Sequence, residues 1–288
     1  MTAFTEWGEL THVVLGRALS HAWPENDKFF NETIKASTWT KTKWNPKLPN
    51  WILNEAEEDL HRLHEIFDAE NIKVSRTTCD CYNARDVLFH FDKTYVCPTP
   101  FTYRRNEPSK FKPWLKDYTV IPIKDNCLFD AANLLKFGDK IVYQVSMTGQ
   151  KAGAKLLQDI LNVEVITWEN VYAFSHIDST CLPLNNNTLL LNGDRVKSDN
   201  LPSFLKSFRK IWVKDIIPQE FYNFPYSSKW IGMNVLSINP ETVLVDSFQT
   251  FLIEQLREEG FKVITSPMRH SRTLGGGMHC VTLDLERK

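Results

Sequence analysis

The chain has 288 residues, which is enough for one large domain or two small ones. It is 42% hydrophobic and 24% charged, as in soluble globular proteins, and its formal net charge of −1 gives no reason to expect binding to nucleic acid or to an anionic membrane. No apolar stretch approaches the roughly 18 residues that a membrane-spanning helix needs, and the first ten residues do not resemble a signal peptide.

The amino-terminal part of the sequence predicts a strand, a long loop, a helix and a second strand. Residues 11–18 are mostly apolar and predict a short buried strand, whereas the aromatic, proline-containing residues 20–52 are typical of a long irregular loop. Asn54 is predicted to cap a helix, and residues 72–76 predict the second strand. The inner face predicted for this helix contains Leu60, Leu63, His64 and Phe67.

From residue 87 onward one unit occurs four times. It consists of two strands joined by a tight turn, then a helix, then a third strand, as the change from alternating to helical spacing of apolar residues predicts. Residues 280–285 can pair with residues 12–16, so both ends of the chain would complete a fifth unit. Repeats of this length suggest a radial or solenoid architecture, and here a closed ring with a central cavity. The four internal units are predicted over residues 87–123, 134–168, 179–213 and 233–265.

Reactive or charged residues stand at equivalent positions near the start of the five units. Successive positions are separated by 44, 48, 50 and 52 residues. An aspartate at a strand entrance is usually a turn or cap residue, and a lone histidine is usually structural. In a closed ring, however, these side chains would all converge on one mouth. The residues are Asp86, Asp130, His176, Asp178, Ser227, Ser228 and Cys280.

Cys280 is the candidate nucleophile of this set. It follows the glycine run 275–277, which would leave room for a ligand and present the thiol at the mouth of a sheet. The alternative is a glycine turn before a buried strand cysteine, which is common. His176 could act as acid and base for the thiol, and Asp130 could orient the histidine.

Asp86 and Asp178 indicate the charge of the ligand. Two carboxylates around one small pocket repel each other unless a cation lies between them. A guanidinium fits, because it is planar and pairs bidentately with carboxylates, and its central carbon could then face the thiolate. Arg195, Ser227 and Ser228 could bind the amino-acid end of such a ligand.

The cysteines and histidines outside this set do not form a recognisable metal site. Six cysteines are too few for a disulfide scaffold in a chain of this length, so a reducing cytoplasmic setting is expected. Cys79 and Cys81 lack the second cysteine pair of a structural zinc site, and only residue type supports adding His61 and His64 as ligands. We therefore predict no metal site, and the chemistry above needs no organic cofactor.

Six motifs carry a resemblance to a known family. They are Glu6–Gly8 with Val13–Ala18, Ala84–Leu88, Phe129–Asn133, His176–Thr180, Ser227–Trp230 with Met233–Leu236, and Leu274–Cys280 with Thr282. In this order, and over nearly the whole chain, they resemble the arginine:glycine amidinotransferase family of the pentein superfamily of guanidine-modifying enzymes. The last two motifs are the most specific.

The resemblance implies an α/β fold, a five-bladed propeller with pseudo-fivefold symmetry, in a single domain over residues 1–288. It implies that Cys280 attacks the guanidino carbon of L-arginine, that His176 protonates the departing ornithine, and that an amine then takes the amidino group. A homodimer is left open as the assembly. The resemblance also implies Asp130 as the partner of His176, Asp86 and Asp178 as guanidinium ligands, and Arg195, Ser227 and Ser228 at the arginine α-carboxylate and amino group.

The sequence departs from the family pattern in several places. Asn133 replaces an acidic residue, Ala84 replaces a frequent proline, and the chain is shorter than the animal enzymes between residues 99 and 128. Residues 173–175 replace the Asn-Pro-Met run that shapes the glycine site, so Ser175 is expected to shape the acceptor site here.

These departures leave the acceptor open. It could be glycine or another small amine such as lysine. Water in its place would make the protein a hydrolase that releases ornithine and urea, and early loss of ammonia would make it a deiminase that forms citrulline. The non-enzymatic alternative is a pentein that serves only as a binding module. The presence of Cys280 and His176 argues against it.

Overall fold

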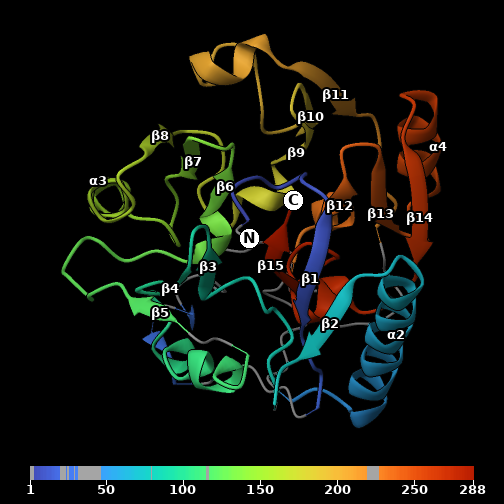
Figure 1. Ribbon diagram of the computed structural model, residues 1–288, viewed down its shortest axis with the longest axis horizontal. Coiled ribbons are helices and arrows are strands. Elements are labelled where there is room, and N and C mark those ends of the chain that lie inside the picture. Colours follow the sequence, from blue (N-terminus) through green and yellow to red (C-terminus); the bar gives the residue numbers. More distant parts are fainter. Residues whose placement is uncertain are drawn as a thin grey trace.

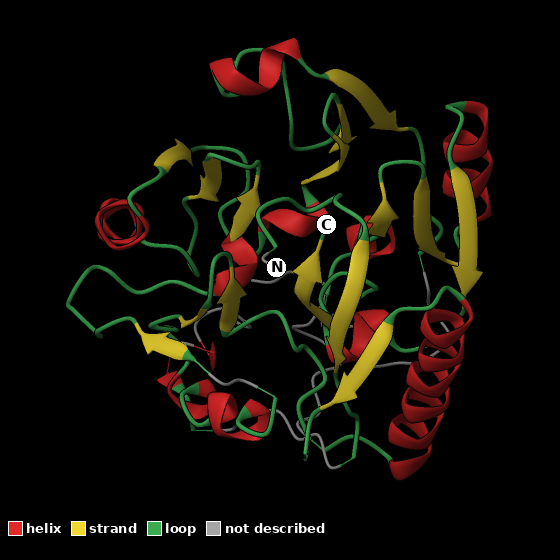
Figure 2. Ribbon diagram, in the orientation of Figure 1, coloured by secondary structure: helices red, strands yellow, loops and turns green. Residues whose placement is uncertain are grey.

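The computed structural model describes residues 3–19, 24, 26–28, 30–31, 47–78, 80–114, 117–218 and 227–288. Across these residues it contains five three-stranded sheets, which Figure 1 shows arranged around a common centre, with the longer helices toward the outside. Figure 2 shows the same mixed α/β composition in each sector. The predicted α/β class is confirmed.

Four sheets are built alike from consecutive segments. In each, two antiparallel strands form a hairpin and a third strand, reached through a helix, adds parallel to the middle one. The first sheet contains β3 (Leu88–His90), β4 (Thr94–Val96) and β5 (Tyr118–Val120); the second contains β6 (Leu134–Lys136), β7 (Lys140–Gln144) and β8 (Glu164–Trp168); the third contains β9 (Cys181–Asn185), β10 (Thr188–Asn192) and β11 (Arg209–Val213); the fourth contains β12 (Leu236–Asn239), β13 (Thr242–Asp246) and β14 (Lys262–Ser266).

The fifth sheet joins the two ends of the chain. Strand β15 (Thr282–Arg287) pairs antiparallel with β1 (Leu10–Leu15), and β1 pairs in parallel with β2 (Lys73–Arg76). Helix α2 (Asn50–Ala69) connects β1 to β2 and lies outside this sheet (Figure 1). The predicted fifth unit, completed by both ends of the chain, is therefore present.

The remaining helices are short. Four of them, over residues 107–111, 151–161, 203–207 and 250–258, occupy connections predicted to be helical, and the others were not predicted. Gly138, with a φ of 79°, makes the turn between β6 and β7, and Gly260, with a φ of 93°, follows α4. Glycine adopts this left-handed backbone without the steric penalty of a side chain. The other helices are α3 (Lys151–Leu161), α4 (Thr250–Glu258), α5 (Ser271–Leu274) and the 3-10 helices η1 (Thr102–Arg104), η2 (Glu107–Phe111), η3 (Ala131–Asn133), η4 (Ile177–Ser179), η5 (Ser203–Ser207) and η6 (Lys229–Met233).

Three inner strands, β6, β9 and β12, are each preceded by a 3-10 helix. The residues directly before these helices are Asp130, His176 and Ser228, all with extended backbone. The structure thus places three of the predicted site residues at the same point of their units. This equivalence brings side chains that are distant in sequence to one side of the fold.

Some local predictions were wrong. Helix α2 begins at Asn50 after Pro49, so Asn54 lies inside it and caps nothing. Ile52 and Leu53 are buried and add one helical turn before Asn54. The charged residues after Asn54 gave no sign of this extra turn.

Two further predictions differ from the structure, and one lies largely outside it. The helix predicted over 109–116 is the shorter 3-10 helix η2, and the predicted inner-face residue His64 is only half-buried. Most of the predicted loop over 20–52 lies outside the described residues. None of the helices that the structure describes is long and apolar enough to cross a membrane.

Candidate active site

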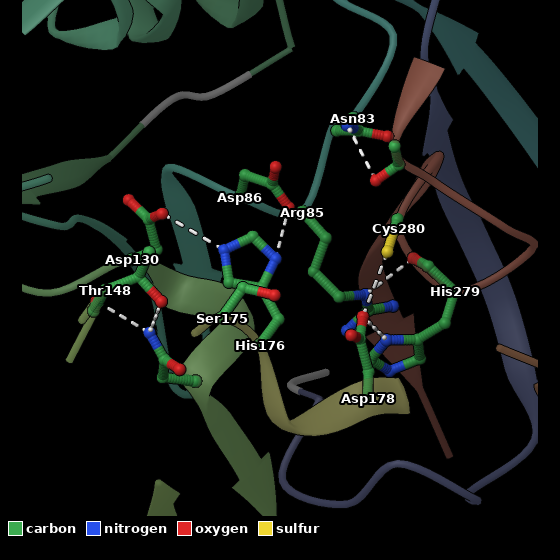
Figure 3. A network of polar contacts seen from close by, with 12 residues as sticks. Asn83, Arg85, Asp86, Asp130, Thr148, Ser175, His176, Asp178, His279 and Cys280 are labelled. Carbon is green, nitrogen blue, oxygen red and sulfur yellow. Dashed lines mark hydrogen bonds and ion pairs between the residues drawn. The ribbon is translucent and has the colours of Figure 1, made fainter. Parts of the chain in front are cut away.

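His176 is held between two aspartates that come from different units of the fold. Its Nε2 lies 3.0 Å from Asp130 Oδ2, and its Nδ1 lies 3.7 Å from Asp86 Oδ1 (Figure 3). Asp86 and Asp130 are 2% and 0% exposed, so both charges act on the ring with little solvent between them. The structure therefore brings these three predicted residues together.

Asp130 is fixed by groups that the sequence analysis did not single out. Thr99 Oγ1 donates a hydrogen bond of 2.5 Å to Asp130 Oδ1, the oxygen that His176 does not contact. The Asp130 N–H donates to the Thr148 carbonyl, which also accepts a bond from Asn133 Nδ2. Asn133, which departs from the family pattern, therefore helps to hold the backbone acceptor of Asp130.

The glycine run before Cys280 makes room for two asparagine side chains. Gly275 ends α5 in left-handed backbone with a φ of 73°. A Cβ on Gly276 would lie 1.8 Å from Asn83 Oδ1, and one on Gly277 would lie 2.8 Å from Asn234 Cβ. The space that the sequence analysis assigned to a ligand is therefore taken, at these two glycines, by side chains of the protein.

Asn234 fixes the backbone around the thiol. Its Oδ1 accepts hydrogen bonds of 3.0 Å from the N–H groups of both His279 and Cys280, and its Nδ2 donates to the Asp178 carbonyl at 3.2 Å. The Cys280 thiol itself donates to Asp178 Oδ2, with the sulfur 3.1 Å from that oxygen (Figure 3). Cys280 and Asp178, which were predicted to face the same mouth, therefore lie in direct contact.

The carboxylates around His176 favour its protonated form. Burial opposes the charge on His176, but the nearby carboxylates of Asp86 and Asp130 outweigh it and raise the pKa of His176 to about 9. The ring is therefore an imidazolium at neutral pH and can act as a general acid.

The same site keeps Cys280 as a thiol. Burial, followed by the negative charges of Asp178 and Asp86, raises the pKa of Cys280 well above its usual value. A cation bound between the two carboxylates would offset these charges and favour the thiolate. The arrangement therefore ties formation of the nucleophile to the arrival of a cationic ligand.

One carboxylate oxygen of Asp86 accepts a hydrogen bond, and the other accepts none from the described residues. Arg104 Nη1 donates to Asp86 Oδ2 at 2.5 Å, and the same guanidinium pairs with Glu107 at 3.1 Å. Asp86 Oδ1 is buried and has no hydrogen-bond donor among the residues that the structure describes. Arg104, which the sequence analysis missed, fixes the carboxylate and leaves Oδ1 as an acceptor beside His176.

Arg195 and Ser228 lie in contact on the neighbouring units. Arg195 Nη2 donates to Ser228 Oγ at 3.1 Å, and its guanidinium lies 3.5 Å from the centre of the Tyr172 ring. Ser227 is joined to Arg272 through its backbone, with an N–H to carbonyl bond of 2.8 Å. Arg195 and Ser228 can thus act together on one ligand group.

Ser175 belongs to a segment that Gln144 holds in place. Gln144 Nε2 donates to the carbonyl of Ser175 and to that of Tyr172, 3.3 Å away. The stretch before His176 is therefore tied to the end of β7. Its conformation is defined by a buried side chain of the preceding unit.

No cluster of side chains suited to hold a metal ion occurs among the described residues. Cys79, one of the cysteines considered as a ligand, lies outside them. The five cysteines that the structure describes are all unpaired thiols.

A scan against models of protein families finds no match. The chain is 31% identical to inosamine-phosphate amidinotransferase 1 of Streptomyces glaucescens, an alignment that covers 100% of this chain and 97% of the relative. It is 29% identical to the L-arginine:L-lysine amidinotransferase of Pseudomonas savastanoi pv. phaseolicola, over 99% and 94% of the two chains. It is 30% identical to the mitochondrial glycine amidinotransferase of Xenopus laevis, over 99% and 82%.

Solved structures agree with these relatives. The structure of an inosamine-phosphate amidinotransferase from Streptomyces griseus matches with a TM-score of 0.93 and 29% identity, over 100% of this chain and 97% of the other. A cyanobacterial arginine dihydrolase matches with a TM-score of 0.72 at 15% identity, over 96% and 98%, which shows a shared fold alone.

Proposed function

Since the chain belongs to the amidinotransferase family and is an enzyme of it, we propose that it takes the amidino group from L-arginine through Cys280. Ornithine leaves, and a small primary amine accepts the group. Two observations carry the proposal. Buried Asp86 Oδ1 accepts no hydrogen bond from the described residues, and on the other side of the site the Asp178 carboxylate lies against the Cys280 thiol.

The donor step follows from the charges of the site. The guanidinium of arginine pairs with Asp86 and Asp178, and its positive charge lowers the pKa of the Cys280 thiol. The thiol then loses its proton to solvent, because His176 is already protonated, and the thiolate forms. The thiolate attacks the guanidino carbon and forms a carbon–sulfur bond. The bond from that carbon to the chain nitrogen of arginine then breaks, and the His176 imidazolium gives its proton to the departing nitrogen of ornithine.

The acceptor step reverses these roles. His176, now neutral, takes a proton from the incoming amine as the amine attacks the amidino carbon held on Cys280. The carbon–sulfur bond breaks and the thiolate is restored.

The far end of the donor arginine is bound elsewhere in the site. Arg195 and Ser228, which contact each other, bind its carboxylate and amino group.

The acceptor is a small amine of the kinds that the relatives' names give. Glycine, L-lysine and an inosamine phosphate are the candidates to compare. The segment that contains Ser175, held by Gln144, lies directly before His176, where an amine must arrive to lose its proton. We expect side chains of this segment to select among the three.

The test is product analysis with purified enzyme. Arginine labelled with 13C in its guanidino carbon is incubated alone and with each amine, and ornithine, urea, citrulline and the amidino product are quantified. Label transferred to an amine supports the proposal. Urea formed at the same rate with and without amine would make the enzyme a hydrolase, and citrulline would make it a deiminase.

Mass spectrometry tests the covalent step in the same samples. An amidino group on the peptide that contains Cys280 is expected with arginine alone. Cys280→Ala should abolish both the adduct and turnover, while Cys127→Ala, which removes another free cysteine, should retain both. Turnover by Cys280→Ala would refute the assignment of the nucleophile.

A further inference from the structure

Residues 83–86 form a tight turn beside residues 274–282, the nucleophile loop that carries Cys280. The Asp86 N–H donates to the Asn83 carbonyl oxygen over 3.3 Å, which closes the turn. Figure 3 shows Asn83, Arg85 and Asp86 beside Cys280. Because Asp86 directly follows Arg85 in the chain, the contacts that hold Arg85 also hold the backbone of Asp86.

Arg85 donates to three backbone carbonyls around the nucleophile. Its N–H lies 3.1 Å from the Cys280 carbonyl oxygen, and its Nε lies 2.9 Å from that of His279 and 3.0 Å from that of Thr282. These three residues of the loop are at most 2% exposed. Since hydrogen bonds between buried groups are costly to lose, they fix the loop against the turn.

The rest of the Arg85 guanidinium is held by two buried carboxylates. Its Nη2 lies 2.5 Å from Asp284 Oδ1, and its Nη1 lies 3.3 Å from Glu6 Oε2. The Arg85 side chain itself is only 7% exposed. The three nitrogens of one planar group thus face different partners, a geometry that the single ammonium group of lysine cannot reproduce.

Asn83 contacts the other end of the nucleophile loop. Its Nδ2 donates to the carbonyls of Leu274 and Gly275, each 3.3 Å away. The turn therefore contacts the loop both before Cys280, through Asn83, and around it, through Arg85. The two contacts differ in burial, because Arg85 is buried whereas Asn83 is partly exposed.

We infer that Arg85 is a positioning residue that sets the separation between the Cys280 thiol and the Asp86 carboxylate. Both groups are tied to this one residue, because Arg85 bonds to the Cys280 carbonyl and is covalently joined to Asp86. Asn83 supports the same separation from the other end of the turn. That Asp86 binds the cationic end of a ligand rests on the proposed function, whereas the contacts of Arg85 do not.

Two alkylating reagents of the same shape test this separation without arginine. Chloroacetamidine is a cation that can pair with Asp86 while its CH2Cl carbon meets the thiol, and chloroacetamide is its neutral analogue. With either reagent the Cys280 sulfur forms a bond to that carbon, chloride leaves, and the thiol proton goes to solvent. The two rates of Cys280 modification are measured by mass spectrometry and divided by the rates with a small free thiol. Their ratio is the preference of the enzyme for the cation.

The wild type should prefer the amidine. Arg85→Lys keeps the positive charge but loses the forked donors, and it should lower this preference roughly 10- to 100-fold, because a displacement of about 1 Å can cost that much. Its reaction with chloroacetamide should change little. A preference equal to that of the wild type would overturn the inference, as would an equal loss with both reagents or a wild type without any preference.

Arg287→Lys is the matched control. Arg287 is another buried arginine that pairs with Asp284, at 2.9 Å, but it donates to the carbonyls of Gly8 and Ser237 instead of the nucleophile loop. The variant should keep the wild-type preference. A loss as large as that in Arg85→Lys would assign the effect to the buried charge network and overturn the inference.

Asn83→Ala keeps the inference testable if Arg85→Lys does not fold. Because it removes two long hydrogen bonds at a partly exposed position, it should lower the preference roughly 2- to 10-fold. A folded Asn83→Ala variant with the wild-type preference would overturn the inference. If the wild type prefers the amidine but transfers no amidino group from arginine, the proposed function fails while the inference stands.

Discussion

Asp130→Asn tests the charge of Asp130, because asparagine has nearly the same shape as aspartate but is neutral. The substitution keeps an oxygen 3.0 Å from His176 Nε2 but removes the negative charge. The rise in the pKa of His176 from 6.5 to about 9 corresponds to roughly 3 kcal/mol in favour of the imidazolium, and Asp86 and Asp130 together supply it against burial. Without the Asp130 charge, the pKa of His176 should fall toward 6.5 or below.

The expected consequence is loss of the general acid at neutral and alkaline pH. At pH 8 we expect kcat for amidino transfer to fall about 30-fold or more, because a histidine with a pKa of 6.5 is only about 3% protonated there, against about 90% for a pKa of 9. The loss should be smaller at pH 6, where more of the variant's His176 is protonated, so the alkaline limb of the pH profile moves to lower pH. KM for arginine should change little, because Asp86 and Asp178 are intact.

The assay is ornithine release from arginine between pH 6 and 10, with circular dichroism to establish that the variant is folded. Asp139→Asn is the matched control, because Asp139 stands in the turn of the same hairpin with its side chain 86% exposed. Its profile should equal that of the wild type. An alkaline limb in Asp130→Asn at the wild-type position would refute the reasoning.

Three other predictions follow from single contacts. Asp86→Asn should raise KM for arginine roughly 10- to 100-fold, because it weakens a charge-assisted bond at Oδ1; an unchanged KM in steady-state kinetics would contradict this role. Gly276→Ala should lower the free energy of unfolding by about 1–3 kcal/mol, because its Cβ would meet Asn83, and a denaturant melt as stable as wild type would be incompatible with this packing. The pKa of His176 is raised in the folded state, so protonation of His176 stabilises the fold fully below about pH 6.5, and this stabilisation is lost as the pH rises through about 9. The free energy of unfolding should therefore fall over this range in the wild type and fall less in His176→Asn. Equal slopes in the two proteins would argue against the raised pKa.

Hydrophobic spacing alone located the repeated units. The period of 2 in the strands and the glycine or asparagine turns are local properties, so the hairpins β6–β7 and β12–β13 were predictable without tertiary information. The near-constant separation of Asp86, Asp130, Asp178, Ser228 and Cys280 also predicted that equivalent positions of the units converge. In the structure Asp86 and Asp130 meet at His176, and Asp178 meets Cys280.

Only the tertiary structure decided how each oxygen and nitrogen of the site is used. Arg104 on Asp86 and Glu6 on His279 come from segments outside the repeated positions, so no spacing in the sequence connects them to their partners. The start of α2 was likewise set by burial of Leu53 in the core cluster that contains Leu10 and Val13 of the terminal sheet, which overrides the local preference for a cap at Asn54. The spacing of repeats along the chain determines which segments form equivalent units. The pairing of charged side chains depends instead on their burial and orientation, which are set only when the sheets have packed together.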